Sequence, residues 1–112
     1  MTILEQYNRA LDAKAAEYRA KADSARLQGD ERGRSICLMQ ASMLGDMLKQ
    51  LGRVEHEGVR PGILQKEIDL MEENARRIRS AGDLDKAERE QIKGQTIRFA
   101  QSELRRLEGE NG

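Results

Sequence analysis

The residues Gln28-Gly29-Asp30 interrupt a long run of helix-favouring residues, and this break decides how the chain folds. Glycine fits the left-handed position that follows a helix, and aspartate suits the N-cap of the next helix. A second break is Ser80-Ala81-Gly82-Asp83, and a third extends from Glu55 to Pro61. We therefore expect four helices, at residues 3–27, 31–53, 61–81 and 85–108, followed by a frayed tail at 109–112.

The residues between the breaks favour helices over strands. Ala, Leu, Glu, Lys, Arg, Gln and Met dominate, and these residues lose the least on entering a helix. Valine occurs only at Val54 and Val59, and no segment alternates apolar and polar residues with a period of two. We expect an all-α fold with a single domain at residues 1–108, either an antiparallel four-helix bundle or a pair of long helical hairpins.

Apolar residues recur at helical spacing within these segments. Thr2 with Glu5 forms a capping-box pattern at the first helix, and Asp85 with Glu88 forms an acidic version at the fourth. The predicted core-facing positions are Ile3, Leu4, Tyr7, Leu11, Ala15, Tyr18, Ala22 and Ala25 in the first helix, Leu64, Ile68, Met71, Ala75 and Ile78 in the third, and Ile92, Thr96, Phe99, Ala100 and Leu107 in the fourth.

The segment 31–53 is apolar on most sides, so we expect it to be the central helix. Gly45 and Gly52 lie on one face of it and predict close backbone approach, either to the first helix or to a second subunit. Met39, Met43 and Met47 follow one edge at a spacing of four. Flexible thioethers suit adaptable surfaces, so this edge is either core or a groove for a partner helix.

Two further apolar pairs at heptad spacing widen the faces of the last two helices. They are Ile63 with Leu70, and Ile97 with Leu104. A wide stripe at the corner of a bundle explains them, and so does a homodimer in which they meet a second copy. Because symmetric dimers are the commonest oligomers, we expect the chain to be homodimeric.

The counts of charged and reactive residues argue against several classes of function. Lys and Arg number 20, and so do Asp and Glu, which gives a net charge of zero and no general attraction to nucleic acid. One histidine and one cysteine, Cys37, supply neither a metal set nor a nucleophile with its base. No glycine-rich nucleotide-binding motif is present. We expect no enzyme activity, no catalytic residues, no metal and no cofactor.

An arginine cluster at Arg76, Arg77 and Arg79 is one local departure from this balance. Acidic residues lie three and four positions away along the same helix, among them Glu72 and Glu73. We therefore expect intrahelical ion pairs to neutralise the cluster. No apolar stretch approaches the roughly 20 residues of a membrane span, and no secretory signal is recognisable, so we expect a cytoplasmic protein.

One end of an up-down-up-down bundle would collect positive charge, because the 55–61 break and the end of the fourth helix meet there. The amide groups at the start of the third helix point to the same end, and helix N-termini favour anions. This end is a predicted site for a phosphate-bearing ligand or an acidic partner, unless nearby glutamates neutralise it. Its basic residues are Arg53, His56, Arg60, Arg105 and Arg106.

These observations favour a small helical interaction module that acts by binding another protein, as an adaptor, an inhibitor or an accessory protein of a mobile element would. A binder of a phosphate-bearing, nucleotide-like molecule, at the arginine-rich end or at a subunit junction, is the alternative. Nucleic-acid binding is the weakest alternative. The expected partner is another protein, a second copy of the chain, or both.

Overall fold

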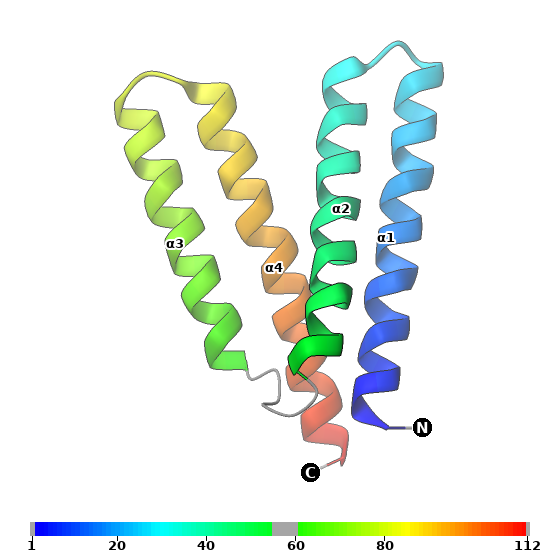
Figure 1. Ribbon diagram of the computed structural model, residues 1–112. Coiled ribbons are helices and arrows are strands. Elements are labelled where there is room, and N and C mark those ends of the chain that lie inside the picture. The colour runs from blue at the N-terminus through cyan, green and yellow to red at the C-terminus, as the bar shows by residue number, and fades with distance from the viewer. Residues whose placement is uncertain (1, 55–60, 112) are drawn as a thin grey trace. The chain divides into compact units, whose positions relative to one another are not determined.

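The computed structural model describes residues 2–54 and 61–111, with burial and side-chain contacts for residues 2–49 and 64–109, and it is almost entirely helical (Figure 1). Its helices are α1 (Ile3–Leu27), α2 (Glu31–Val54), α3 (Pro61–Ser80) and α4 (Leu84–Asn111). No strand occurs in these residues. The expected all-α fold and its four helices are thereby confirmed.

The helices form two hairpins, and the chain divides into two compact units at that level. In the first unit α1 packs against α2. In the second, side-chain hydrogen bonds join α3 to α4. A single domain over residues 1–108, a four-helix bundle and a homodimer stay predictions.

Both hairpins turn by the same hydrogen-bonded device. The N–H of Gly29 donates to the carbonyl of Arg26 at 3.1 Å, and the N–H of Asp30 donates to the carbonyl of Ala25 at 2.8 Å. The turn at Gly82 repeats both bonds, at 3.0 and 3.3 Å. This is a Schellman motif, and it needs a left-handed residue. The two glycines supply it, with φ of 76° and 92°, as the sequence predicted.

The aspartate after each glycine caps the next helix. The Asp30 carboxylate accepts from the N–H of Gly33 at 2.9 Å, and the Asp83 carboxylate accepts from the N–H of Lys86 at 3.1 Å. Such caps satisfy amides that the first helical turn leaves without a partner. A side chain at position 33 would meet the Asp30 carboxylate, which would have to shift to make room for it. Each aspartate therefore ends one helix and begins the next.

The start of α4 differs from the sequence prediction. The capping pair of Asp85 with Glu88 was wrong, because Asp83 is the N-cap and the helix begins at Leu84. Asp85 instead binds the Arg89 guanidinium at 3.1 Å, within the helix. The Schellman turn decides the matter, since it places Asp83 directly at the first free amides.

The outer ends of the helices are close to their predicted positions. At the start of α1, the Thr2 hydroxyl accepts from the N–H of Glu5 at 3.1 Å, which confirms that cap. α4 continues beyond its predicted end at residue 108, so the tail expected to fray is helical as far as Asn111. Leu107, only 2% exposed, anchors these last turns to the core.

The two hairpins bury equivalent positions. Counted in residues back from the glycine of each turn, Leu11 of α1 matches Leu64 of α3, and Ala22 matches Ala75. All four residues are buried. Alanine brings the helices close but buries little apolar area, so it contributes less stability than leucine would. The other buried apolar side chains are Tyr7, Ala15, Ala25, Ala41, Leu44, Ile68, Ala87, Ile97, Ala100, Leu104 and Leu107.

The second apolar pair of α4 belongs to the core. Ile97 is 5% exposed and Leu104 is 2% exposed, which fits the wide apolar stripe, one of the two explanations offered for this pair. Their burial takes them away from the surface at which a second copy would dock. Leu70 is 47% exposed, and its predicted partner Ile63 lies outside the residues with described side chains.

Close backbone approach occurs at Gly94 and not at Gly45. A Cβ added to Gly45 would meet no atom within 4 Å, so the predicted approach of α1 is not found there. A Cβ added to the buried Gly94 would lie 3.5 Å from the Met71 Cβ and 4.0 Å from the Ile68 carbonyl oxygen. Gly94 therefore lets α4 run close to α3. Approach of a second subunit at Gly45 stays a prediction, and Gly52 lies outside the described contacts.

These glycine environments predict opposite effects of alanine. Gly82→Ala forces an alanine into the left-handed region and should lower the free energy of unfolding by about 1–2 kcal/mol. Gly45→Ala, inside a helix with open space around it, should raise that free energy by up to about 1 kcal/mol. Urea denaturation followed by circular dichroism measures both. A destabilising Gly45→Ala would contradict the open environment.

Candidate functional site

The predicted arginine-rich end is not assembled by the described residues. Arg53, His56 and Arg60 fall outside the described side chains. Arg105 and Arg106 are exposed on α4, and Arg106 binds Glu103 of its own helix at 2.9 Å. A site at that end stays a prediction.

The methionine edge of α2 is half-covered. Met39, Met43 and Met47 are all partly buried, which fits neither a full core position nor an open groove. Leu38, on the same helix, is 41% exposed. The edge is available in part to a partner, and its role stays a prediction.

A groove lies between α3 and α4 on one face of their hairpin. It encloses about 550 Å³, and the buried Ala75 lies at its base. All but one of its lining residues are polar, and those of each helix share one face because they are spaced by three, four or seven positions. We call it the arginine groove, and it is lined by Glu72, Ala75, Arg76 and Arg79 of α3 and by Gln91, Gln95 and Arg98 of α4.

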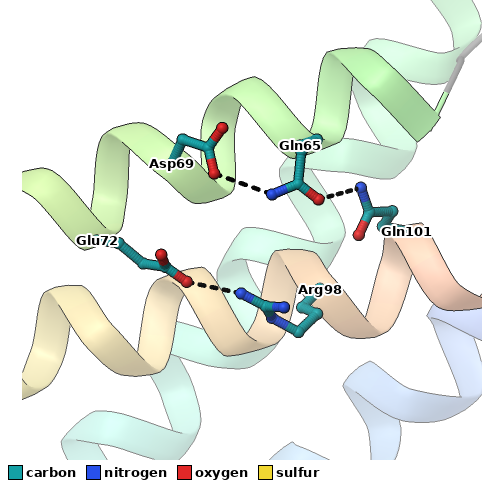
Figure 2. Close-up of polar contacts among 5 residues, drawn as sticks. All are labelled: Gln65, Asp69, Glu72, Arg98 and Gln101. Atoms are coloured by element: carbon teal, nitrogen blue, oxygen red, sulfur yellow. Dashed lines mark hydrogen bonds and ion pairs between the residues drawn. The ribbon is translucent and has the colours of Figure 1, made fainter.

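Two side-chain bonds cross this groove. Arg98 donates to the Glu72 carboxylate at 2.6 Å, as Figure 2 shows. Arg79 donates to the amide oxygen of Gln91 at 3.0 Å. The partners are spaced by seven along each helix, two turns apart, so the pairs match the antiparallel register of the hairpin. The walls of the groove are thus held in place by bonds between the two helices.

A buried amide fixes the same register further along. Gln101 is 3% exposed, and its amide donates to the side-chain oxygen of Gln65 at 2.9 Å. Gln65 donates in turn to the Asp69 carboxylate at 2.9 Å (Figure 2). A buried polar group that lost its partner would be costly, so this chain of bonds disfavours a shift of α3 along α4. Gln101 was not among the predicted core positions, although Ile97 and Leu104 flank it on the helix face.

The charge of the arginine groove departs from the predicted intrahelical neutralisation. Arg77 binds Glu73 at 3.1 Å, as the spacing predicted. Glu72 instead reaches across to Arg98, which removes the acidic partner four residues before Arg76. Within residues 2–49 and 64–109, the exposed Arg76 side chain makes no hydrogen bond or ion pair. Arg76 and Arg79 therefore leave two positive charges uncompensated on this face.

A second hollow, lined by four polar and two apolar side chains, adjoins the arginine groove. It encloses about 500 Å³ and shares Arg79, Gln91 and Gln95 with the groove, so the two form one continuous surface. Leu84 at its rim is 65% exposed, and Ile92 is half-buried. We call it the leucine hollow. The face thus combines guanidinium groups with an exposed apolar side chain.

The surface of α1 is charged as well, and there Glu17 lies between two lysines. Glu17 lies 3.4 Å from the Lys14 ammonium and 3.5 Å from that of Lys21. The hydrogen bond from Lys14, followed by its charge, lowers the pKa of Glu17 below the ordinary value. Both ammonium groups also lie over the Tyr18 ring, at 5.4 and 5.8 Å from its centroid. This surface resembles an ordinary solvated helix face.

The Glu17 cluster gives a titration test. Lys14→Met should raise the pKa of Glu17 toward its ordinary value, because the lysine that lowers this pKa most is lost. Because the pKa of Glu17 is lowered in the folded chain, its ionised form stabilises the folded state at pH values above its ordinary pKa. This stabilisation is lost as the pH falls through the lowered pKa. Carboxyl NMR across an acid titration measures the shift. An unchanged pKa would contradict the pairing.

The cross-helix ion pair predicts a small coupling energy. Glu72 and Arg98 are about half exposed, at 49% and 54%, so we expect about 0.2–1 kcal/mol between them. A double-mutant cycle with Glu72→Gln and Arg98→Gln measures it by urea denaturation, and added salt should reduce it. A coupling of zero at low salt would show that the pair does not hold the groove.

No three His, Cys, Asp or Glu side chains among the described residues gather closely enough to hold a metal ion. None of the helices, over the residues described, is long and apolar enough to cross a membrane. Comparison with protein-family models, curated proteins and solved structures found no match to this chain.

Proposed function

We propose that the chain is a non-enzymatic interaction module that binds another protein through the α3–α4 hairpin. The observation that carries this proposal is the continuity of the arginine groove with the leucine hollow. Arginine is among the residues that dominate binding energy at protein interfaces, and an apolar anchor beside it supplies buried area. A groove between two helices also suits a partner helix.

The apolar part of this face favours a protein over a phosphate-bearing small molecule. A phosphate would use the guanidinium groups of Arg76 and Arg79 but would gain nothing from Leu84. A peptide segment can use both at once. The phosphate-bearing ligand is therefore the second candidate, and its support is limited to the uncompensated charge of the groove.

A second copy of the chain is another candidate partner, at a different surface. The open space around Gly45 and the partial exposure of Leu38 support a contact on α2. Sedimentation equilibrium would reveal the dimer, which is separate from binding at the α3–α4 hairpin.

A comparison of captured proteins tests the proposed function. The tagged chain is incubated with extract of its native cell, beside the double variant Arg76→Gln/Arg79→Gln. The matched control is Arg9→Gln/Arg19→Gln, which removes the same charge from exposed positions of α1. We expect the wild type and the control to retain a protein that the groove variant does not retain. The captured protein loses its contacts with Arg76 and Arg79 in that variant.

Equal retention by the wild type and the groove variant would contradict binding through this face. Circular dichroism should show unchanged helix content in both double variants, since all four arginines are exposed. Thermal stabilisation by a nucleotide that depends on Arg76 and Arg79, without a groove-dependent protein, would favour the phosphate-bearing ligand instead.

A further inference from the structure

We infer that the partner segment is an acidic amphipathic helix, with two carboxylates one helical turn apart and an apolar residue beyond them toward Leu84. This inference rests on the proposed function and specifies the chemistry of the partner. Charge complementarity along the arginine groove and the leucine hollow carries it.

The two carboxylates follow from the spacing of the uncompensated arginines. Arg76 and Arg79 are three residues apart on α3, so their α-carbons are separated by about 4.5 Å along the helix axis. Carboxylates three or four residues apart on a partner helix have nearly the same separation. A guanidinium offers several N–H donors in a planar fork that matches a carboxylate. Arg76 and Arg79 can therefore each bind one of the two acidic side chains at the same time.

The hydrogen bonds inside the groove limit the number of partner carboxylates that it can bind to two. Arg98 is engaged by Glu72 at 2.6 Å, and a third carboxylate placed there would be repelled by Glu72. Arg79 gives one donor to Gln91, which leaves its other donors for a partner. The acidic specificity therefore centres on Arg76 and Arg79.

The leucine hollow sets the other end of the motif. Apolar contact is available there from Leu84, Ile92 and the side-chain methylene groups of Gln91 and Gln95. Glu88 at the rim disfavours a further carboxylate. Leu84 stands at the first position of α4, directly after the turn. An apolar partner side chain therefore belongs on the turn side of the two carboxylates.

The equivalent face of the other hairpin lacks this pattern. Counted from the Gly-Asp turns, Asp23 of α1 stands where Arg76 stands in α3, and Gly45 of α2 stands where Arg98 stands in α4. An acidic helix would meet a carboxylate there. Arg26 does stand where Arg79 stands, but no second arginine lies one turn from it on α1, so we expect the acidic segment to bind the α3–α4 hairpin.

Selection from a random peptide library tests the inference on the full-length chain. The displayed peptides are about 14 residues long, or roughly four helical turns. We expect enriched sequences with paired Asp or Glu at spacings of three or four, followed or preceded by a large apolar residue. Synthetic versions should bind about tenfold more weakly to Arg76→Gln/Arg79→Gln, and unchanged to Arg9→Gln/Arg19→Gln. Added salt should weaken the binding to the wild type.

Enrichment of neutral or basic peptides, equal binding by the groove variant, or no enrichment would each overturn the inference. The proposed function fails separately. If a captured protein depends on Arg76 and Arg79 while the enriched peptides are not acidic, the function stands and the acidic helix is wrong. If adenosine triphosphate binds in a groove-dependent way and no captured protein or peptide does, both proposals are overturned.

Discussion

A left-handed glycine followed directly by a capping aspartate closes each hairpin, and the rest of the structure depends on this pair. The N–H groups of the glycine and the aspartate bind the last carbonyls of one helix, and the aspartate carboxylate accepts from a first-turn amide of the next. Because the same aspartate takes part in the end of one helix and the start of the next, the connection between the two helices is short and its length is fixed. The register of the two antiparallel helices is therefore set at the turn.

The register determines which side chains meet across the α3–α4 hairpin. It brings Glu72 opposite Arg98 and Arg79 opposite Gln91, while Gly94 and Ala75 keep the helices close. Glu72 is drawn away from Arg76 by this pairing. A chain with no net charge thereby acquires a locally positive face, and that face adjoins an exposed leucine.

Much of the fold could be predicted from local sequence, whereas the site could not. The Gly-Asp turns and the Thr2 cap depend on nearby residues, and the sequence indicated them correctly. Five of the eight core-facing positions predicted for α1 are buried, and Ile3, Leu4 and Tyr18 are half-buried. The cap of α4 was misplaced because two aspartates lie within one turn of each other. The partner of Glu72 depends on the register between helices, since an intrahelical and a cross-helix ion pair have similar energies. The buried Gln101 and the close approach at Gly94 depend on that register too.

Backbone amide NMR of the labelled chain, with and without the captured partner protein, tests binding at this face most directly. The shifts that change on binding should cluster at residues 72–79 of α3 and 84–98 of α4, on both sides of the arginine groove and the leucine hollow. Changes confined to the methionine edge of α2, at Met39, Met43 and Met47, would contradict a binding face on the α3–α4 hairpin.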